Sequence, residues 1–192
     1  MENSLAMKNK TTKALNRRTF LRTSSVALTG ITIIPRNVLG GSGNIAPSDK
    51  LTVAYIGCGA RGLAELIELV PNSETQIVAV CDPENYAENY LEFVNKSMVN
   101  SIRKILEKPG WGGSIKGCPG GRTIGQEIVN TYYAKTRSQE SYKGCKSYAD
   151  FRELLEKEGD KIDSVNVAVP DHMHFPIAMM AIQMGKHVFV QK

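Results

Sequence analysis

Apolar residues follow two alternating patterns between residues 51 and 190. Short, nearly continuous apolar runs occupy 51–56, 76–81, 163–169 and 187–190, as in strands that are buried on both faces. The segments between them carry apolar residues three or four positions apart, and several end at glycine or proline, as amphipathic helices do. This alternation predicts an α/β fold, a Rossmann-like doubly wound parallel sheet.

The regular alternation is interrupted between residues 83 and 147. This stretch is longer than a crossover helix needs, because a whole βαβ unit can be built from about thirty residues. Helices are predicted over 84–107 and 126–137, with a glycine-rich loop between them. We therefore interpret 83–147 as an insertion. A surface excursion is the preferred interpretation, and a lid over the cofactor or an oligomer contact anchored by Trp111 is the alternative.

Residues 1–40 have the order of a signal peptide, in which a basic segment precedes an apolar segment and then small residues. The pair Arg17–Arg18 precedes Phe20, so the segment is similar to a twin-arginine signal, with Asn16 and Arg22 as departures. Export to the periplasm by the twin-arginine machinery is therefore expected. A basic surface helix or a short membrane anchor is the alternative, although the apolar run is shorter than the ~20 residues of a membrane span.

The positive charge of the chain lies in this leader. The formal net charge is +5, and residues 1–40 hold seven Lys and Arg but one Glu, so the remaining residues sum to about −1. A near-neutral body offers no basic face for a phosphate backbone, and nucleic acid is not expected as a partner.

Residues 41–49 are expected to form a linker. If the chain is exported, Cys118 and Cys145 could form a disulfide, and the sequence leaves this open.

A glycine pattern follows the first predicted strand and opens the next helix. Gly57, Gly59 and Gly62 have the G-x-G-x-x-G spacing of dinucleotide-binding turns. The first glycine allows the sharp bend, the second lets a diphosphate approach the backbone, and the third lets the helix pack closely on the strand. Free N–H groups at the start of that helix attract phosphate. The candidate cofactor-binding residues of this turn are Gly57, Gly59, Ala60, Arg61 and Gly62.

Asp82 ends the second predicted strand, 20 residues beyond Gly62. A carboxylate at this position can accept hydrogen bonds from the adenosine ribose hydroxyls and would repel a 2′-phosphate. The nicotinamide dinucleotide that binds here is therefore expected to be NAD, with NADP less favoured. An aspartate before Pro83 is also a common helix cap, which is the alternative interpretation.

Polar residues also follow the carboxyl ends of the later strands. Asp171, His172, His174 and Lys192 are expected on the ligand side of the sheet, because ligands of open α/β sheets lie beyond those ends. Two histidines without a third ligand nearby make a poor metal site, so no metal is expected.

The ordered set of motifs resembles the N-terminal domain of the glucose-fructose oxidoreductase, inositol dehydrogenase and rhizopine-catabolism (Gfo/Idh/MocA) family. It comprises the glycine turn, Asp82 and the segments 150–155, 169–174 and 185–192. The resemblance implies that Pro170, Asp171 and His174 line the nicotinamide end of the pocket. It also implies that Lys192 lies beside the substrate as a catalytic residue. Family members move a hydride between NAD(P) and a sugar or cyclitol hydroxyl.

The chain departs from the family pattern at three points. Val169 occupies a position where the family has threonine, and Gln191 occupies one where it has glutamate. The chain also stops before the expected proline. The resemblance therefore implies a sheet that is incomplete at its last strand, without the second domain that binds substrate and forms a homo-oligomer in the full-length form. We expect residues 50–192 to be the NAD(P)-binding half of an exported oxidoreductase, inactive alone. The alternatives are a stand-alone nucleotide-binding module or partner subunit, and an NAD-dependent glycoside hydrolase of the same family.

Overall fold

The computed structural model describes residues 45–90, 96–112, 117–137 and 142–191. The predicted signal peptide at 1–40, residues 41–44 of the predicted linker, and Lys192 lie outside the described residues. In chain order the elements are η1 (Pro47–Asp49), β1 (Leu51–Ile56), α2 (Ala60–Leu69), β2 (Thr75–Cys81), β3 (Ala87–Tyr90), α3 (Lys96–Leu106), β4 (Cys118–Gly120), α4 (Arg122–Thr136), β5 (Lys146–Tyr148), α5 (Phe151–Glu158), η2 (Gly159–Lys161), β6 (Ser164–Val167), α6 (Asp171–Gln183) and β7 (His187–Val190).

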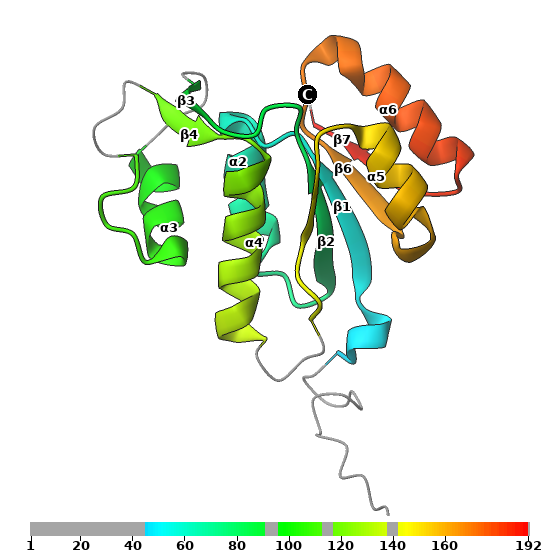
Figure 1. Cartoon of the computed structure of the whole chain (residues 1–192). Helices are drawn as coiled ribbons and strands as arrows, with labels where there is room; N and C mark the ends of the chain where they lie inside the picture. The colour runs from blue at the N-terminus through cyan, green and yellow to red at the C-terminus, as the bar shows by residue number, and fades with distance from the viewer. Residues whose placement is uncertain (1–44, 91–95, 113–116, 138–141, 192) are drawn as a thin grey trace, which may run out of the picture. The chain divides into compact units, whose positions relative to one another are not determined.

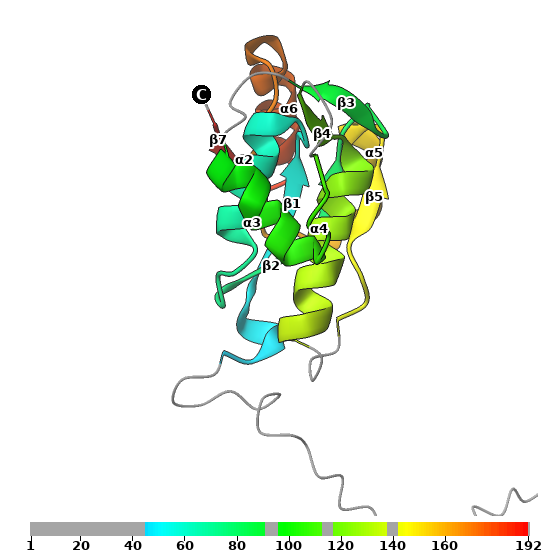
Figure 2. The ribbon, with the colours of Figure 1, turned by 90° about the vertical axis from the view of Figure 1, so that its left-hand side faces the viewer.

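Five of the strands form one parallel sheet in the order β5-β2-β1-β6-β7. The chain starts in the middle at β1, moves to one side through β2 and β5, and then returns to the other side through β6 and β7. Helices α2, α3 and α4 lie on one face of this sheet, and α5 and α6 lie on the other (Figure 1). Turning the molecule by 90° brings α2, α3 and α4 toward the viewer (Figure 2). The predicted Rossmann-like doubly wound sheet is confirmed.

Alternate residues of the central strand β1 belong to two separate cores. Val53 and Tyr55 are buried with α2, α3 and α4, whereas Ala54 and Ile56 are buried with α5 and α6. These four side chains are at most 4% exposed. A parallel strand that is covered on both faces has apolar residues at every position, which explains the continuous apolar run in the sequence.

The segment between β2 and β5 contains more than a crossover helix. Helix α4 packs against both of these strands and makes the crossover. Before it, β3 and β4 form a two-stranded antiparallel ribbon in which Ala87 faces Gly120 and Tyr90 faces Cys118. The ribbon lies near the end of the sheet where β1 and β2 terminate (Figure 1). The prediction of a helix over 84–107 is therefore wrong in its first part, because pairing with a strand distant in sequence overrides the local preference.

Helix α5 begins where the sequence predicts it. The Asp150 carboxylate accepts a hydrogen bond of 2.8 Å from the backbone N–H of Arg152, as an N-cap residue does. The predicted helix over 126–137 begins earlier, at Arg122. Strand β6 ends at Val167, two residues before the predicted end.

The excursion, which comprises β3, α3 and β4 before helix α4, packs onto the rest of the domain. Trp111 is half-buried against the core formed with α2, α3 and α4, and the Arg103 guanidinium donates to its carbonyl oxygen at 2.8 Å. All four cysteines are free and buried, so Cys118 and Cys145 are not joined in this structure. Within the described ranges, no helix is both long enough and apolar enough to cross a membrane.

Candidate functional site

The turn between β1 and α2 is shaped by close contacts between backbone segments. Gly57 has a φ of 103°, and a Cβ on it would lie 2.1 Å from the carbonyl oxygen of Ala168, just beyond β6. A Cβ on Gly62 would lie 2.1 Å from the carbonyl oxygen of Gly57. The turn is thus drawn against the end of β6, and α2 is drawn against the turn. Both positions require glycine in the manner that the sequence predicts for the first and third glycines.

The N-terminal end of α2 lies behind the turn. Gly59 is the N-cap residue, with no side-chain cap. The N–H groups of the first turn have no acceptor inside the helix, so they are available to an anion. Ala60 is buried at 4% exposed. The exposed Arg61 pairs with Glu65 at 2.8 Å along the helix.

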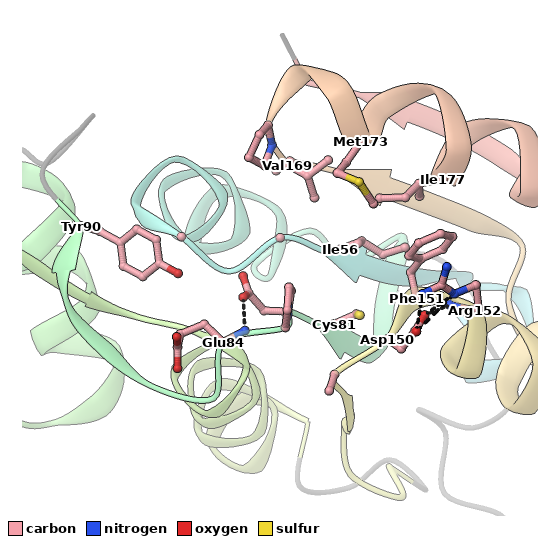
Figure 3. A pocket seen from close by; sticks show the side chains of 17 residues that line it. Ile56, Cys81, Glu84, Tyr90, Asp150, Phe151, Arg152, Val169, Met173 and Ile177 are labelled. Atoms are coloured by element: carbon pink, nitrogen blue, oxygen red, sulfur yellow. Dashed lines mark hydrogen bonds and ion pairs between the residues drawn. The ribbon is translucent and has the colours of Figure 1, made fainter.

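A cavity of about 620 Å³ opens beyond the carboxyl ends of β1, β2, β5 and β6 (Figure 3). This volume falls in the ordinary range of ligand pockets. One wall comes from the glycine turn and the end of β2, and the opposite wall comes from the starts of α5 and α6. Its lining residues are Ile56, Gly57, Gly59, Cys81, Asp82, Pro83, Glu84, Tyr90, Ala149, Asp150, Phe151, Arg152, Ala168, Val169, Pro170, Met173 and Ile177.

Asp82 joins the two halves of the first wall. Its Oδ2 accepts a hydrogen bond of 2.7 Å from the backbone N–H of Cys58, and its Oδ1 accepts one of 2.8 Å from the N–H of Glu84. The residue is 7% exposed. Burial raises the pKa of the carboxyl group, and the two N–H donors oppose that rise. No helix begins at Pro83, so Asp82 is not the helix cap of the alternative interpretation.

Of the three residues predicted to line the nicotinamide end of the pocket, only one lines this second wall. Pro170 lines the cavity together with Val169 and Met173. The ring of His174 instead bonds through Nε2 to the carbonyl oxygen of Val169 at 2.8 Å. Asp171 is exposed in the first turn of α6.

The structure thus brings together four of the predicted site residues: Gly57, Gly59, Asp82 and Pro170 line one cavity. Ala60, Arg61, Gly62, Asp171 and His174 lie around it without lining it. Lys192, the predicted catalytic residue, lies outside the described residues. Within the part of the chain that the structure describes, no group of three His, Cys, Asp or Glu side chains could hold a metal ion.

Sequence reasoning missed several lining residues. The start of α5, from Asp150 to Arg152, follows the end of strand β5, and the rule that ligands lie beyond strand ends could have identified it. Figure 3 shows Asp150 and Arg152 joined by an ion pair, which is 2.7 Å long, beside Phe151. Tyr90 carries no such signal, because it reaches the cavity from the excursion rather than from the sheet.

Comparison with known proteins agrees with this geometry. Residues 123–192 match the model of the Gfo/Idh/MocA oxidoreductase family, described as an NAD-binding Rossmann fold. The match lies over the second half of the domain and includes α4 to β7. With the sheet topology, it supports an NAD-binding Rossmann domain of the oxidoreductase type.

Two curated relatives are called glycosyl hydrolase family 109 proteins. The one from Stenotrophomonas maltophilia (strain K279a) is 28% identical over 172 residues, which are 90% of this chain and 28% of the relative. The one from Shewanella pealeana (strain ATCC 700345 / ANG-SQ1) is 25% identical over 191 residues, covering 92% of this chain and 33% of the relative. The chain therefore spans about a third or less of these relatives.

Among solved structures, an NAD binding oxidoreductase from Klebsiella pneumoniae matches with 19% identity and a TM-score of 0.35. The match covers 74% of this chain and 27% of that protein.

Proposed function

We propose that this chain is the NAD-binding domain of an exported Gfo/Idh/MocA oxidoreductase that moves a hydride between NAD and a sugar or cyclitol hydroxyl. The observation that carries the proposal is the cavity at the carboxyl edge of the parallel sheet, bounded by the glycine turn and Asp82. This is the crevice in which doubly wound sheets bind dinucleotides. The leader at 1–40 supports the export part of the proposal.

The residues present fit a dinucleotide. The turn is a cradle that side chains would fill, since a Cβ at Gly57 or Gly62 would meet backbone oxygen at 2.1 Å. The start of α2 would hold the diphosphate, Asp82 would accept from the adenosine ribose, and the surface around Pro170 would hold the nicotinamide. When bound, the cofactor supplies the acceptor or donor for a hydride. Lys192 is the proposed residue beside the reacting hydroxyl.

Two carboxylates favour NAD over NADP. Asp82 and Glu84 both line the cavity at the end of β2. A 2′-phosphate placed there would meet negative charge that is only partly screened, whereas two ribose hydroxyls could donate to it.

Calorimetric titration of the 192-residue chain with NAD and with NADP tests this proposal. We expect a dissociation constant for NAD in the micromolar range, as for many substrates and cofactors, and affinity for NADP at least about tenfold lower. Asp82→Ala should weaken NAD binding and also narrow the ratio of the two affinities. The ratio is the informative readout, because a merely structural loss would weaken both ligands equally. Absence of NAD binding to the folded wild-type chain would refute the proposal.

A second function is favoured by the names of the two curated relatives, both glycosyl hydrolase family 109 proteins. Transient oxidation at a sugar carbon labilises a neighbouring glycosidic bond, and returning the hydride leaves no net oxidation. Activity measurements on the native gene product, purified from its own cells, separate the two functions. Release of a nitrophenol from a nitrophenyl glycoside without accumulation of NADH would indicate the hydrolase. NADH formation from a free polyol would indicate the dehydrogenase.

A further inference from the structure

The ring of Tyr90 lies in a slot between two glycines from different parts of the chain. A Cβ on Gly59, in the nucleotide turn, would lie 3.1 Å from Cε1 of the ring. A Cβ on Gly120, in β4, would lie 2.7 Å from Cδ2 and Cε2. Neither glycine has a positive φ. The backbone conformation therefore does not demand glycine at these two positions. The Tyr90 ring restricts the space for a Cβ at both, and at Gly120 the carbonyl oxygen of Cys58, 2.9 Å from that Cβ, restricts it as well.

The excursion that carries Tyr90 is tied to the nucleotide turn and to the end of β2. The Gly121 N–H donates to the carbonyl oxygen of Cys58 at 2.8 Å. The Arg122 guanidinium donates to the carbonyl oxygens of Asp82 at 3.1 Å and Pro83 at 2.8 Å. Tyr90 is thus held relative to the turn before any ligand binds, and such preorganisation favours binding.

The hydroxyl of Tyr90 is directed into the cavity (Figure 3). Among the described residues it has no hydrogen-bond partner. Burial, together with the carboxylates of Asp82 and Glu84, raises the pKa of Tyr90 to about 12, so the hydroxyl keeps its proton at neutral pH. The ring is fixed, and the free group at its end is a neutral hydrogen-bond donor.

We propose that Tyr90 is a cofactor-contacting residue supplied by the β3–β4 excursion, and that its hydroxyl donates a hydrogen bond to the diphosphate of the dinucleotide. This inference rests on the proposed NAD-binding function. The ring packs on Gly59, the N-cap of α2, where a diphosphate would lie. Phosphate oxygens only accept hydrogen bonds, and the neighbouring carboxylates of Asp82 and Glu84 cannot donate one. The excursion then has a role in binding and is more than a surface addition.

The test compares Tyr90→Phe with the wild-type chain by calorimetry, using NAD, ADP and adenosine as ligands. We expect the variant to bind NAD and ADP about ten- to a hundredfold more weakly, the range of one hydrogen bond to a charged group. Adenosine, which has no phosphate, should bind both proteins equally. The melting temperature should not change, because the hydroxyl has no protein partner. Tyr86→Phe is the matched control: Tyr86 is 44% exposed and donates to Glu88 at 3.0 Å. It should bind all three ligands as the wild type does.

The outcomes separate this inference from the function on which it rests. If the wild type binds NAD and Tyr90→Phe binds it equally well, the role of Tyr90 is refuted and the function stands. An equal loss for adenosine would place the contact on the nucleoside and overturn the assignment to the diphosphate. If the wild type binds none of the ligands, the proposed NAD-binding function is refuted, and the role of Tyr90 is refuted with it.

Discussion

At the residue scale, the nucleotide turn depends on glycines, whose missing Cβ atoms leave space for neighbouring groups. Gly57 and Gly62 each leave space that a backbone carbonyl oxygen occupies, and such an oxygen cannot move aside as a flexible side chain can. Gly59 is different, because the Tyr90 ring occupies its space. The G-x-G-x-x-G spacing predicted all three positions, but it could not show that the second glycine faces an aromatic ring.

Replacing Gly62 by alanine should therefore destabilise the domain. The new Cβ would have to displace the backbone of Gly57, and we expect a loss of at least about 2 kcal/mol in the free energy of unfolding. Urea denaturation followed by circular dichroism measures this. Gly110→Ala is the control, because a Cβ there meets nothing within 4 Å, and its unfolding free energy should stay within about 0.5 kcal/mol of the wild type. Equal urea-denaturation midpoints for the wild type and Gly62→Ala would show that the turn has room for a methyl group at Gly62, which would contradict the close packing.

For Asp82, the sequence predicted the position of the residue but not all of its contacts. Its position at the end of the second strand followed from spacing alone. Its bond to the Cys58 N–H did not, because that contact arises only when β1 and β2 pair side by side and their ends meet. The carboxylate therefore has a structural role in addition to the proposed role toward ribose.

At the scale of elements, four of the five strands of the sheet were predictable, whereas β5 and the excursion were not. Strands such as β1 are buried on both faces, so their apolar runs are continuous and distinctive. Strand β3 contains only Ala87–Tyr90 and carries no such run. Its partner β4, in a glycine-rich stretch predicted as a loop, follows 28 positions after Tyr90 in the pair Tyr90–Cys118. No local pattern encodes that pairing, and the Tyr90 position in the cavity depends on it.

The beginnings of β1 and β6 are joined by a polar contact that depends on pH. The Asp163 carboxylate accepts hydrogen bonds from the Thr52 hydroxyl at 2.6 Å and from the Thr52 N–H at 2.8 Å. These bonds lower the pKa of Asp163, with weaker contributions from Lys186 and His187. The ionised form is therefore favoured in the folded state. Its contribution to stability is present above the unfolded pKa of about 4 and is lost as the pH falls through the lower folded value.

Asp163→Asn should consequently lower stability at pH 7 and have less effect in acid. Because Asp163 is exposed, we expect a loss of only about 0.5–1 kcal/mol at pH 7. The difference from the wild type should shrink as the pH falls from about 4 to 2. Urea denaturation at several pH values measures it. Asp160→Asn, an exposed site in η2 with the same charge change, should show little effect at any pH. A constant difference across the pH range would mean that the Asp163 charge is not responsible.

At the scale of the whole described domain, strand order determines where the chemistry can occur. Because β1 lies between β2 and β6, the strand order reverses at β1, and the ends of these three strands open into one crevice. The sequence predicted this edge of the sheet and four of the residues that line the cavity. It could not predict how α5, α6 and the excursion close the cavity, since those positions depend on packing between distant segments.

The most direct test of the account is a titration of the ¹⁵N-labelled 192-residue chain with NAD, followed by amide chemical shifts. We predict that the largest changes occur at Gly57, Gly59, Gly62 and the residues after Asp82. Gly110 and Gly185, which do not line the cavity, should change little. Saturable shifts confined to this edge of the sheet would establish the dinucleotide site. An unchanged spectrum at millimolar NAD, or shifts centred on another surface, would contradict the central claim.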